Sequence, residues 1–128
     1  MRLLLDTHAL LWFLRDPEKL PARVLCEIET AGPRTSVSMA SLWEIAIKTS
    51  LNKLCLPKPF DELFPQSVPD SGLSLLGIEP RHLNEVSRLP WHHRDPFDRL
   101  LIAQAKCDGL TLVSCDPKFA SYGVSVLW

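Results

Sequence analysis

The 128-residue sequence lacks several features that mark particular classes of protein. It has no surplus of positive charge, because 14 Lys and Arg face 15 Asp and Glu. This balance excludes a polycation that binds nucleic acid by bulk charge alone. No apolar run approaches the roughly 18–20 residues of a membrane-crossing helix. The apolar start is interrupted by Asp6 and His8, and no signal-peptide cleavage site follows it. We therefore expect a cytoplasmic protein with no membrane partner.

Cysteine and glycine are also sparse. The four cysteines stand singly, without a Cys-x-x-Cys pair, which argues against a zinc ribbon or a redox centre. A chain of this length needs no disulfides, so we expect free and mostly buried thiols. Only five glycines are present, and none forms a phosphate-binding loop. The last observation disfavours a phosphatase or phosphotransfer domain of the doubly wound type.

The composition is that of a globular protein, with 46% hydrophobic and 23% charged residues. Short apolar runs predict strands at residues 2–5, 35–38, 73–78, 110–113 and 124–127. Helical patterns predict helices at residues 9–14, 21–32, 39–51, 80–89 and 97–107, with Leu83 and Val86 inward in the fourth. Residues 54–72 predict a loop with one short helix near 60–64, and Asp116-Pro117 opens a helix of one or two turns. This alternation predicts a single α/β domain over residues 1–128: a three-layer α/β/α sandwich with a mainly parallel sheet.

Four acidic residues stand where such a domain places functional groups, in the crevice beyond the carboxyl ends of the strands. Asp6 and Asp116 follow predicted strands, and Glu44 and Asp98 lie near helix starts. Each acid alone is explained by capping: Asp6 and Asp116 as N-caps, and Ser41-x-x-Glu44 as a capping box.

The four acids together favour a metal site. Asp95 with Pro96 already supplies an N-cap, so Asp98 is not needed for capping. Glu44 lies among apolar residues, where an unpaired carboxylate is costly. A cation would relieve the repulsion between converging carboxylates, and ligands that are all oxygen favour Mg²⁺ or Mn²⁺ over zinc.

Four segments carry a family resemblance: DTHALLW (residues 6–12), WEIAIK (43–48), HRDPFDRLLIAQA (93–105) and LVSCD (112–116). Together they resemble the PIN-domain family, and within it the VapC-like ribonuclease toxins of bacterial toxin–antitoxin pairs. The resemblance covers essentially the whole chain. It implies an α/β/α sandwich, Mg²⁺-dependent endoribonuclease activity, a homodimer and inhibition by a cognate antitoxin.

Carried over by position, the resemblance implies that Asp6, Glu44, Asp98 and Asp116 bind the metal. Ser114 falls where the family often has a small hydroxyl or amide residue near the metal, and Cys115 where a basic residue is common. The remaining candidates for supporting or substrate-contacting roles are Thr7, Asp95, Arg99 and Lys48, with Arg94 and Lys118 as further possible phosphate contacts.

Several alternatives stay open at this stage. Three interpretations of His92 and His93 stay open. They are a pair of metal ligands, an acid–base pair, or side chains that lie on a loop surface or in a hydrogen-bonded core position. The aromatic residues of segments 9–14 and 39–51 line a groove for an antitoxin helix, or belong to the core or a homodimer contact. The activity alternatives are an inactive PIN-like module that binds RNA or protein, and a housekeeping RNA-processing nuclease.

Overall fold

Five short parallel strands form the centre of the computed structural model, which describes residues 1–128. The strand order is β3-β2-β1-β4-β5, and all four neighbouring pairs are parallel. The strands are β1 (Leu3–Leu5), β2 (Thr35–Ser38), β3 (Ser74–Leu76), β4 (Thr111–Val113) and β5 (Val126–Leu127). The α/β class and the parallel sheet expected from the sequence are confirmed.

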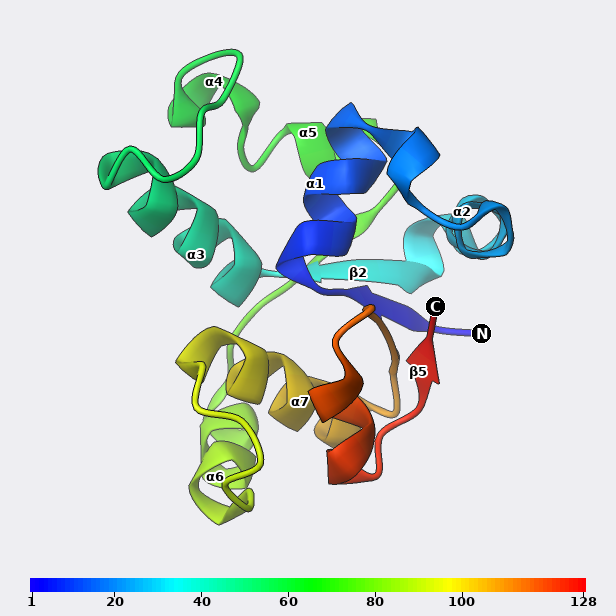
Figure 1. Ribbon diagram of the computed structural model, residues 1–128, viewed down its shortest axis with the longest axis vertical. Coiled ribbons are helices and arrows are strands. Elements are labelled where there is room, and N and C mark those ends of the chain that lie inside the picture. The colour runs from blue at the N-terminus through cyan, green and yellow to red at the C-terminus, as the bar shows by residue number, and fades with distance from the viewer.

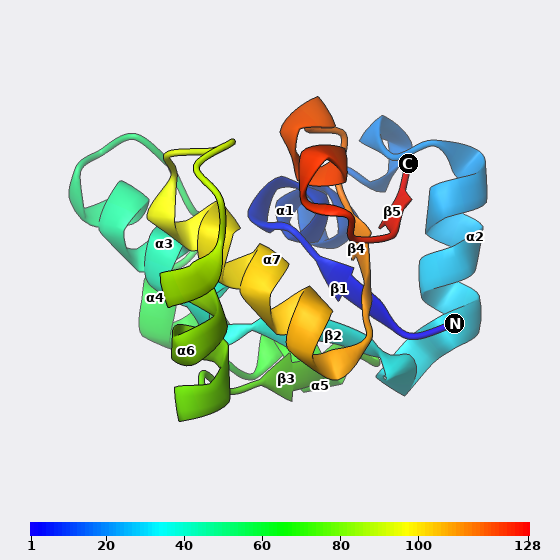
Figure 2. The ribbon, with the colours of Figure 1, turned by 90° about the horizontal axis from the view of Figure 1, so that it is seen from below.

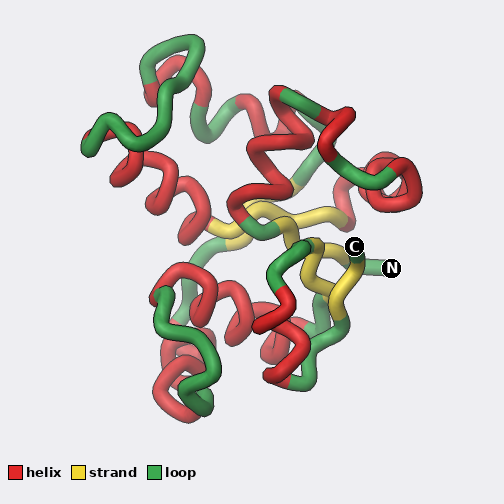
Figure 3. Tube along the Cα trace, viewed as in Figure 1, coloured by secondary structure: helices red, strands yellow, loops and turns green.

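Helices cover both faces of this sheet, as the tube in Figure 3 and the ribbon in Figure 1 show. α1, α2 and α5 lie on one side of the strands, and α6 and α7 lie on the other (Figure 1). The helices are α1 (Thr7–Arg15), α2 (Ala22–Ala31), α3 (Met39–Ser50), α4 (Phe60–Leu63), α5 (Ser67–Asp70), α6 (Pro80–Arg88) and α7 (Pro96–Asp108). Three 3₁₀ helices complete the list: η1 (Pro17–Lys19), η2 (Gly32–Arg34) and η3 (Pro117–Tyr122).

The central strand β1 explains why its sequence is apolar without alternation. Successive side chains of a strand point to opposite faces, so a strand covered on both faces must be apolar throughout. Leu3 and Leu5 join a core cluster with residues of α1, α2 and α3. Leu4 joins a second cluster with α7 and with Phe119 of η3. Figure 2 shows α6 and α7 on the near side of the sheet, covering this second face.

The structure corrects the expected burial of α6. Leu83 was expected to point inward, but it is 55% exposed, and the fully buried side chain of this helix is His82. Polar partners make this burial possible. The backbone N–H of Glu79 donates to Nδ1 of His82 (3.0 Å), and Nε2 lies 3.2 Å from a carboxylate oxygen of Asp108.

Two smaller expectations also fail. All four cysteines are free as expected, but they are exposed rather than mostly buried, because they fall on outward positions of helices and loops. The segment 54–72 contains α5 in addition to the expected short helix, here α4. The helices are all too short or too polar to span a bilayer.

Candidate metal centre

The sheet order places Asp6 and Asp116 beside each other in the fold. Asp6 follows β1 directly, and Asp116 follows β4, which pairs with β1. From β1 the chain continues to β2 on one side of the strand and returns later to β4 on the other. Such a reversal of strand order opens a crevice at the carboxyl ends of the two strands, and ligands of α/β proteins bind there.

Asp6 is buried at the start of α1, where its Oδ1 accepts a hydrogen bond from the backbone N–H of Ala9 (2.7 Å). It is therefore the N-cap of this helix, as its simplest interpretation predicted. Burial raises the pKa of Asp6, and the charge of Glu44 acts in the same direction. Hydrogen bonds from Ser114 and Ala9 and the charge of His8 act against this rise.

Glu44 lies on α3 with both carboxylate oxygens engaged and only 5% of the residue exposed. Thr7 Oγ1 donates to Oε1 (2.7 Å), and Lys48 Nζ lies 2.6 Å from Oε2. The expected capping box at Ser41 and Glu44 is absent, because α3 begins earlier and Ser38 is its N-cap. These two partners, rather than capping, compensate the burial of the Glu44 charge.

Asp98 occupies the first turn of α7, and Asp95 caps that helix as expected. One carboxylate oxygen of Asp95 accepts from the backbone N–H groups of Phe97 (2.8 Å) and Asp98 (3.1 Å). Burial, and after it the nearby carboxylates of Asp95, Glu44, Asp6 and Asp116 in that order, raise the pKa of Asp98 to about 8. The carboxylates of Glu44, Asp6 and Asp116 are therefore near enough to Asp98 for their charges to act on its pKa.

His93 lies between two of these acids. Its Nε2 is 3.0 Å from Asp98 Oδ2 and 3.1 Å from Asp116 Oδ2. The three side chains offer ligand atoms within 4.8 Å of one another, so they could hold a metal ion. The adjacent His92 is exposed and packs edge-on against the ring of Tyr122. The histidine pair therefore separates into one surface side chain and one buried, hydrogen-bonded side chain at the site.

The other predicted residues divide between the site and the surrounding structure. Ser114 Oγ accepts from the backbone N–H of Asp116 (3.0 Å), and Asp116 Oδ1 accepts from that of Lys118 (2.9 Å), which caps η3. Asp116 thus both caps a helix and faces His93. Lys48 lies 40% exposed beside Glu44.

Arg99 does not occupy the expected substrate-facing position. It is 3% exposed, and its guanidinium donates to the carbonyl oxygens of Val86, Leu89 and Pro90 and to the hydroxyl of Tyr122. The exposed ring of Trp91 stacks over it, with the ring centroid 3.7 Å from Cζ. A guanidinium enclosed in this way holds the 86–93 segment and is not available to a phosphate.

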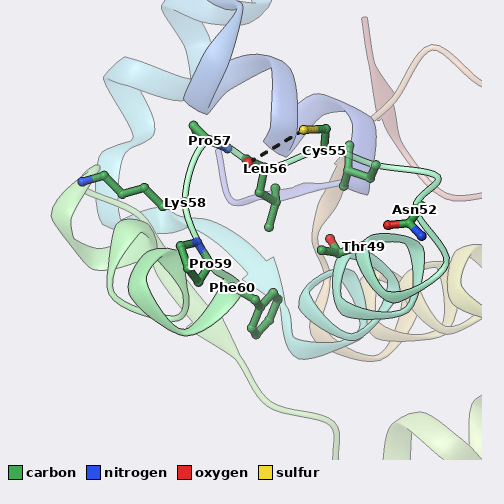
Figure 4. Close-up of a pocket in the computed structure, with 9 residues that line it drawn as sticks. Thr49, Asn52, Cys55, Leu56, Pro57, Lys58, Pro59 and Phe60 are labelled. Carbon is green, nitrogen blue, oxygen red and sulfur yellow. Dashed lines mark hydrogen bonds between the residues drawn. The ribbon is translucent and has the colours of Figure 1, made fainter.

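Three clefts lie against α3, two of them at its C-terminal half. A cleft of about 590 Å³, drawn in Figure 4, is formed by the 52–60 segment and the end of α3. It contains none of the predicted acids. A second cleft of about 330 Å³ runs from Thr7 between α1 and α3, and four cations line it: Arg15, Lys19, Lys48 and Lys53. Two of its lining residues, Thr7 and Lys48, also contact Glu44, so the second cleft adjoins that acid.

Comparisons with known proteins agree with this fold. The sequence matches the PIN domain family over residues 3–124. The fold resembles DNA-bound VapBC from Salmonella typhimurium (16% identity, TM-score 0.75, 99% of this chain and 97% of that chain). It also resembles FitAcB from Neisseria gonorrhoeae (17%, 0.67, 98% and 96%) and a toxin–antitoxin complex from Klebsiella pneumoniae (16%, 0.61, 98% and 95%). The comparison with curated proteins gives no significant match.

Proposed function

Because the chain belongs to the PIN-domain family, we propose that it is a Mg²⁺-dependent endoribonuclease and the toxin of a toxin–antitoxin pair. The observation that carries this proposal is the grouping of Asp98 and Asp116 with His93, whose ligand atoms lie within 4.8 Å of one another. The charges of Asp6 and Glu44 also act on the pKa of Asp98, which supports their place in the same site. Like charges gathered in a buried crevice are costly for a protein that binds no cation there. A bound cation would offset this repulsion and would explain why the acids lie close together.

The donor set fits a hard divalent ion. The four proposed ligands offer carboxylate oxygens, which suit Mg²⁺ and also Mn²⁺. When bound, the ion would supply Lewis-acid stabilisation of the charge that develops on a phosphodiester during hydrolysis.

The chain's own cations would bring RNA to the acids. A cluster of carboxylates repels a phosphate backbone, so a polyanionic substrate needs positive charge beside the site. The cleft that begins at Thr7 supplies it, with Arg15, Lys19, Lys48 and Lys53 against the single acid Asp16. Lys48 stands at the boundary between this cleft and Glu44. A single RNA strand can follow these side chains toward the proposed metal.

The proposed partner is a cognate antitoxin protein. The structurally similar complexes named above include a toxin–antitoxin complex, and this supports a protein partner for the present chain. On α1, Trp12 packs against Trp128 and belongs to the partly buried edge of the core. On α3, Trp43 is 57% exposed beside an apolar cleft that Met39, Leu42 and Phe64 also line. We therefore place the antitoxin contact on α3 and not on α1, with a homodimer contact there as the competing outcome.

Cleavage of labelled RNA tests the activity. The purified wild-type protein is compared with Asp98→Asn, and with Asp61→Asn as a control for loss of one exposed acid on α4. We expect cleavage with Mg²⁺ by wild type and Asp61→Asn, and none with a chelator or in Asp98→Asn. Binding of RNA without cleavage under every condition would instead establish the inactive binding module.

Co-expression tests the biological role. The chain is produced with the protein encoded by the neighbouring small open reading frame, and the pair is purified through one tag. We expect toxicity of the chain alone and a stable complex that blocks cleavage. Trp43→Ser should weaken that complex. A chain that cleaves RNA but is harmless alone and finds no blocking partner would be a housekeeping nuclease.

A further inference from the structure

We propose that His93 is a positioning residue of the candidate metal centre, which donates its Nε2 N–H to Asp116 beside Asp98 and does not itself bind the metal. The inference rests on the proposed function, because it concerns the same site. The position of His93 alone suggests the opposite role, since its Nε2 lies as close to the two carboxylates as a third ligand would.

Hydrogen bonding at the other ring nitrogen decides the tautomer. The backbone N–H of Asp95 lies 3.1 Å from Nδ1 of His93. A backbone N–H can only donate, so Nδ1 must accept and carries no proton. A neutral imidazole then holds its one proton on Nε2. The N–H of Nε2 therefore donates to Oδ2 of Asp116 (3.1 Å), and Oδ2 of Asp98 lies 3.0 Å from the same nitrogen.

A protonated Nε2 has no lone pair to offer a cation. Metal-binding histidines of proteins donate from one nitrogen and coordinate through the other. In His93 the nitrogen that faces the acids is the donor, and the free lone pair faces the backbone of Asp95. Coordination would require the ring to turn and to lose the contact with that backbone.

The surroundings of His93 oppose such a turn. Its backbone N–H donates to the hydroxyl of Tyr122 (2.8 Å), and its ring lies 6.0 Å from the ring of Phe119. Both aromatic residues belong to η3, the helix that Asp116 caps. Asp95 caps α7, the helix that carries Asp98.

His93 thus connects the starts of two helices, each of which contributes one carboxylate to the site. The proton on Nε2 is hydrogen-bonded to Oδ2 of Asp116, and its partial positive charge also lies next to the carboxyl oxygen of Asp98. The spacing of Asp98 and Asp116 is then set before any cation binds. Pre-organisation of this kind lowers the cost of metal binding.

Histidine side-chain NMR of the wild-type protein without metal tests the tautomer directly. Proton–nitrogen correlations assigned through His93→Gln should show the proton of His93 on Nε2. A proton on Nδ1 would overturn the proposal, whatever the protein binds.

Mn²⁺ titration followed by electron paramagnetic resonance tests the positioning role. His93→Ala removes the donor, His93→Gln keeps an N–H donor at a similar reach, and His92→Ala is the neighbouring control. We expect Mn²⁺ affinity to fall about 10–100-fold in His93→Ala, to recover in large part in His93→Gln, and to stay unchanged in His92→Ala. In pulsed spectra of the Mn²⁺-bound wild type, we expect no signal from a nitrogen of His93. The nitrogen signals of wild type and His93→Gln should therefore be the same.

The outcomes separate the two proposals. A directly bound nitrogen that disappears in His93→Gln would make His93 a ligand and overturn this inference, but leave the nuclease proposal intact. Wild-type affinity in a folded His93→Ala would do the same. A wild-type protein that binds neither Mn²⁺ nor Mg²⁺ would overturn the proposed function and, with it, the role of His93 toward a metal. If His93→Ala fails to fold, the wild-type spectra and His93→Gln still decide.

Discussion

The hydroxyl of Thr7, the first residue of α1, donates a hydrogen bond of 2.7 Å to Oε1 of Glu44 on α3. The same oxygen of Thr7 lies 3.1 Å from Oγ of Ser41. This contact joins the two helices that begin at the carboxyl ends of β1 and β2. It holds one oxygen of a buried carboxylate at the crevice by a group that carries no charge, while Lys48 supplies a positive charge at the other oxygen.

Replacement of Thr7 by Val should destabilise the protein without changing its shape. Val has the size of Thr, but it leaves Oε1 of a buried carboxylate without its donor, which costs about 1–3 kcal/mol of unfolding free energy. Urea denaturation of metal-free protein measures the loss, with Thr30→Val at an exposed position of α2 as the control. Equal stability of the two variants would show that water or Ser41 replaces the hydroxyl.

Replacement of Asp98 by Asn should weaken metal binding but leave the metal-free fold intact. Loss of an outer partner of a metal site typically costs 10–100-fold, so loss of a proposed ligand in Asp98→Asn should lower Mn²⁺ affinity at least about 100-fold. The metal-free fold should remain intact, because Asp95 and not Asp98 caps α7. Calorimetric Mn²⁺ titration and thermal melts without metal measure the two effects. A variant that unfolds would assign Asp98 a structural role.

The stability of metal-free protein should depend on pH through Asp98. The pKa of Asp98 lies at about 8 in the fold, above its ordinary value of 3.8. The folded state therefore holds a proton that the unfolded chain releases, and stability from this group declines as pH rises from about 4 to 8. Melting temperatures measured across this range should fall less steeply in Asp98→Asn than in wild type. Parallel curves would contradict the raised pKa.

Metal binding should release protons below pH 8. A carboxyl group must lose its proton to bind a cation, and burial with neighbouring acids holds the proton on Asp98. Calorimetric Mg²⁺ titrations at pH 7, in buffers of different ionisation heats, count the protons released. We expect about one proton per ion at pH 7 and a smaller number at pH 9. The count should be near zero at both values if the carboxylates are already charged.

Arg99 should be important for folding rather than for catalysis. Arg99→Met keeps most of the side-chain volume but leaves several buried carbonyl oxygens without a donor, and this costs at least about 2 kcal/mol. Arg94→Met, at an exposed position just after segment 86–93, serves as the control. Urea denaturation compares the two variants. A folded Arg99→Met with normal stability and selectively weaker RNA binding would restore the substrate role.

Much of the architecture was predictable because its causes are local. The uninterrupted apolar run at β1 indicates a strand that is buried on both faces, and Asp95-Pro96 and Asp116-Pro117 mark helix starts through capping. The proposal that Asp98 serves something other than a cap followed from the same local chemistry, since Asp95 leaves it nothing to cap. The position of each acid relative to a strand or helix therefore followed from the order of residues.

The contacts around the acids depended on residues far apart in the chain. His93 meets Asp116 across 23 positions, Thr7 meets Glu44 across 37, and the carbonyl partners of Arg99 become visible only when segment 86–93 folds over α7. Local patterns made Arg99 a candidate for phosphate binding, because nothing near it in sequence announces that it is buried. Local patterns also left the role of His93 undecided. Its tautomer depends on the backbone of Asp95, and the acceptor of its N–H depends on the packing of η3 beside α7. The sequence by itself determined the order of the strands and the main helices. Only the tertiary structure decided the partners of each charge, because burial and hydrogen bonding depend on what the rest of the chain places nearby.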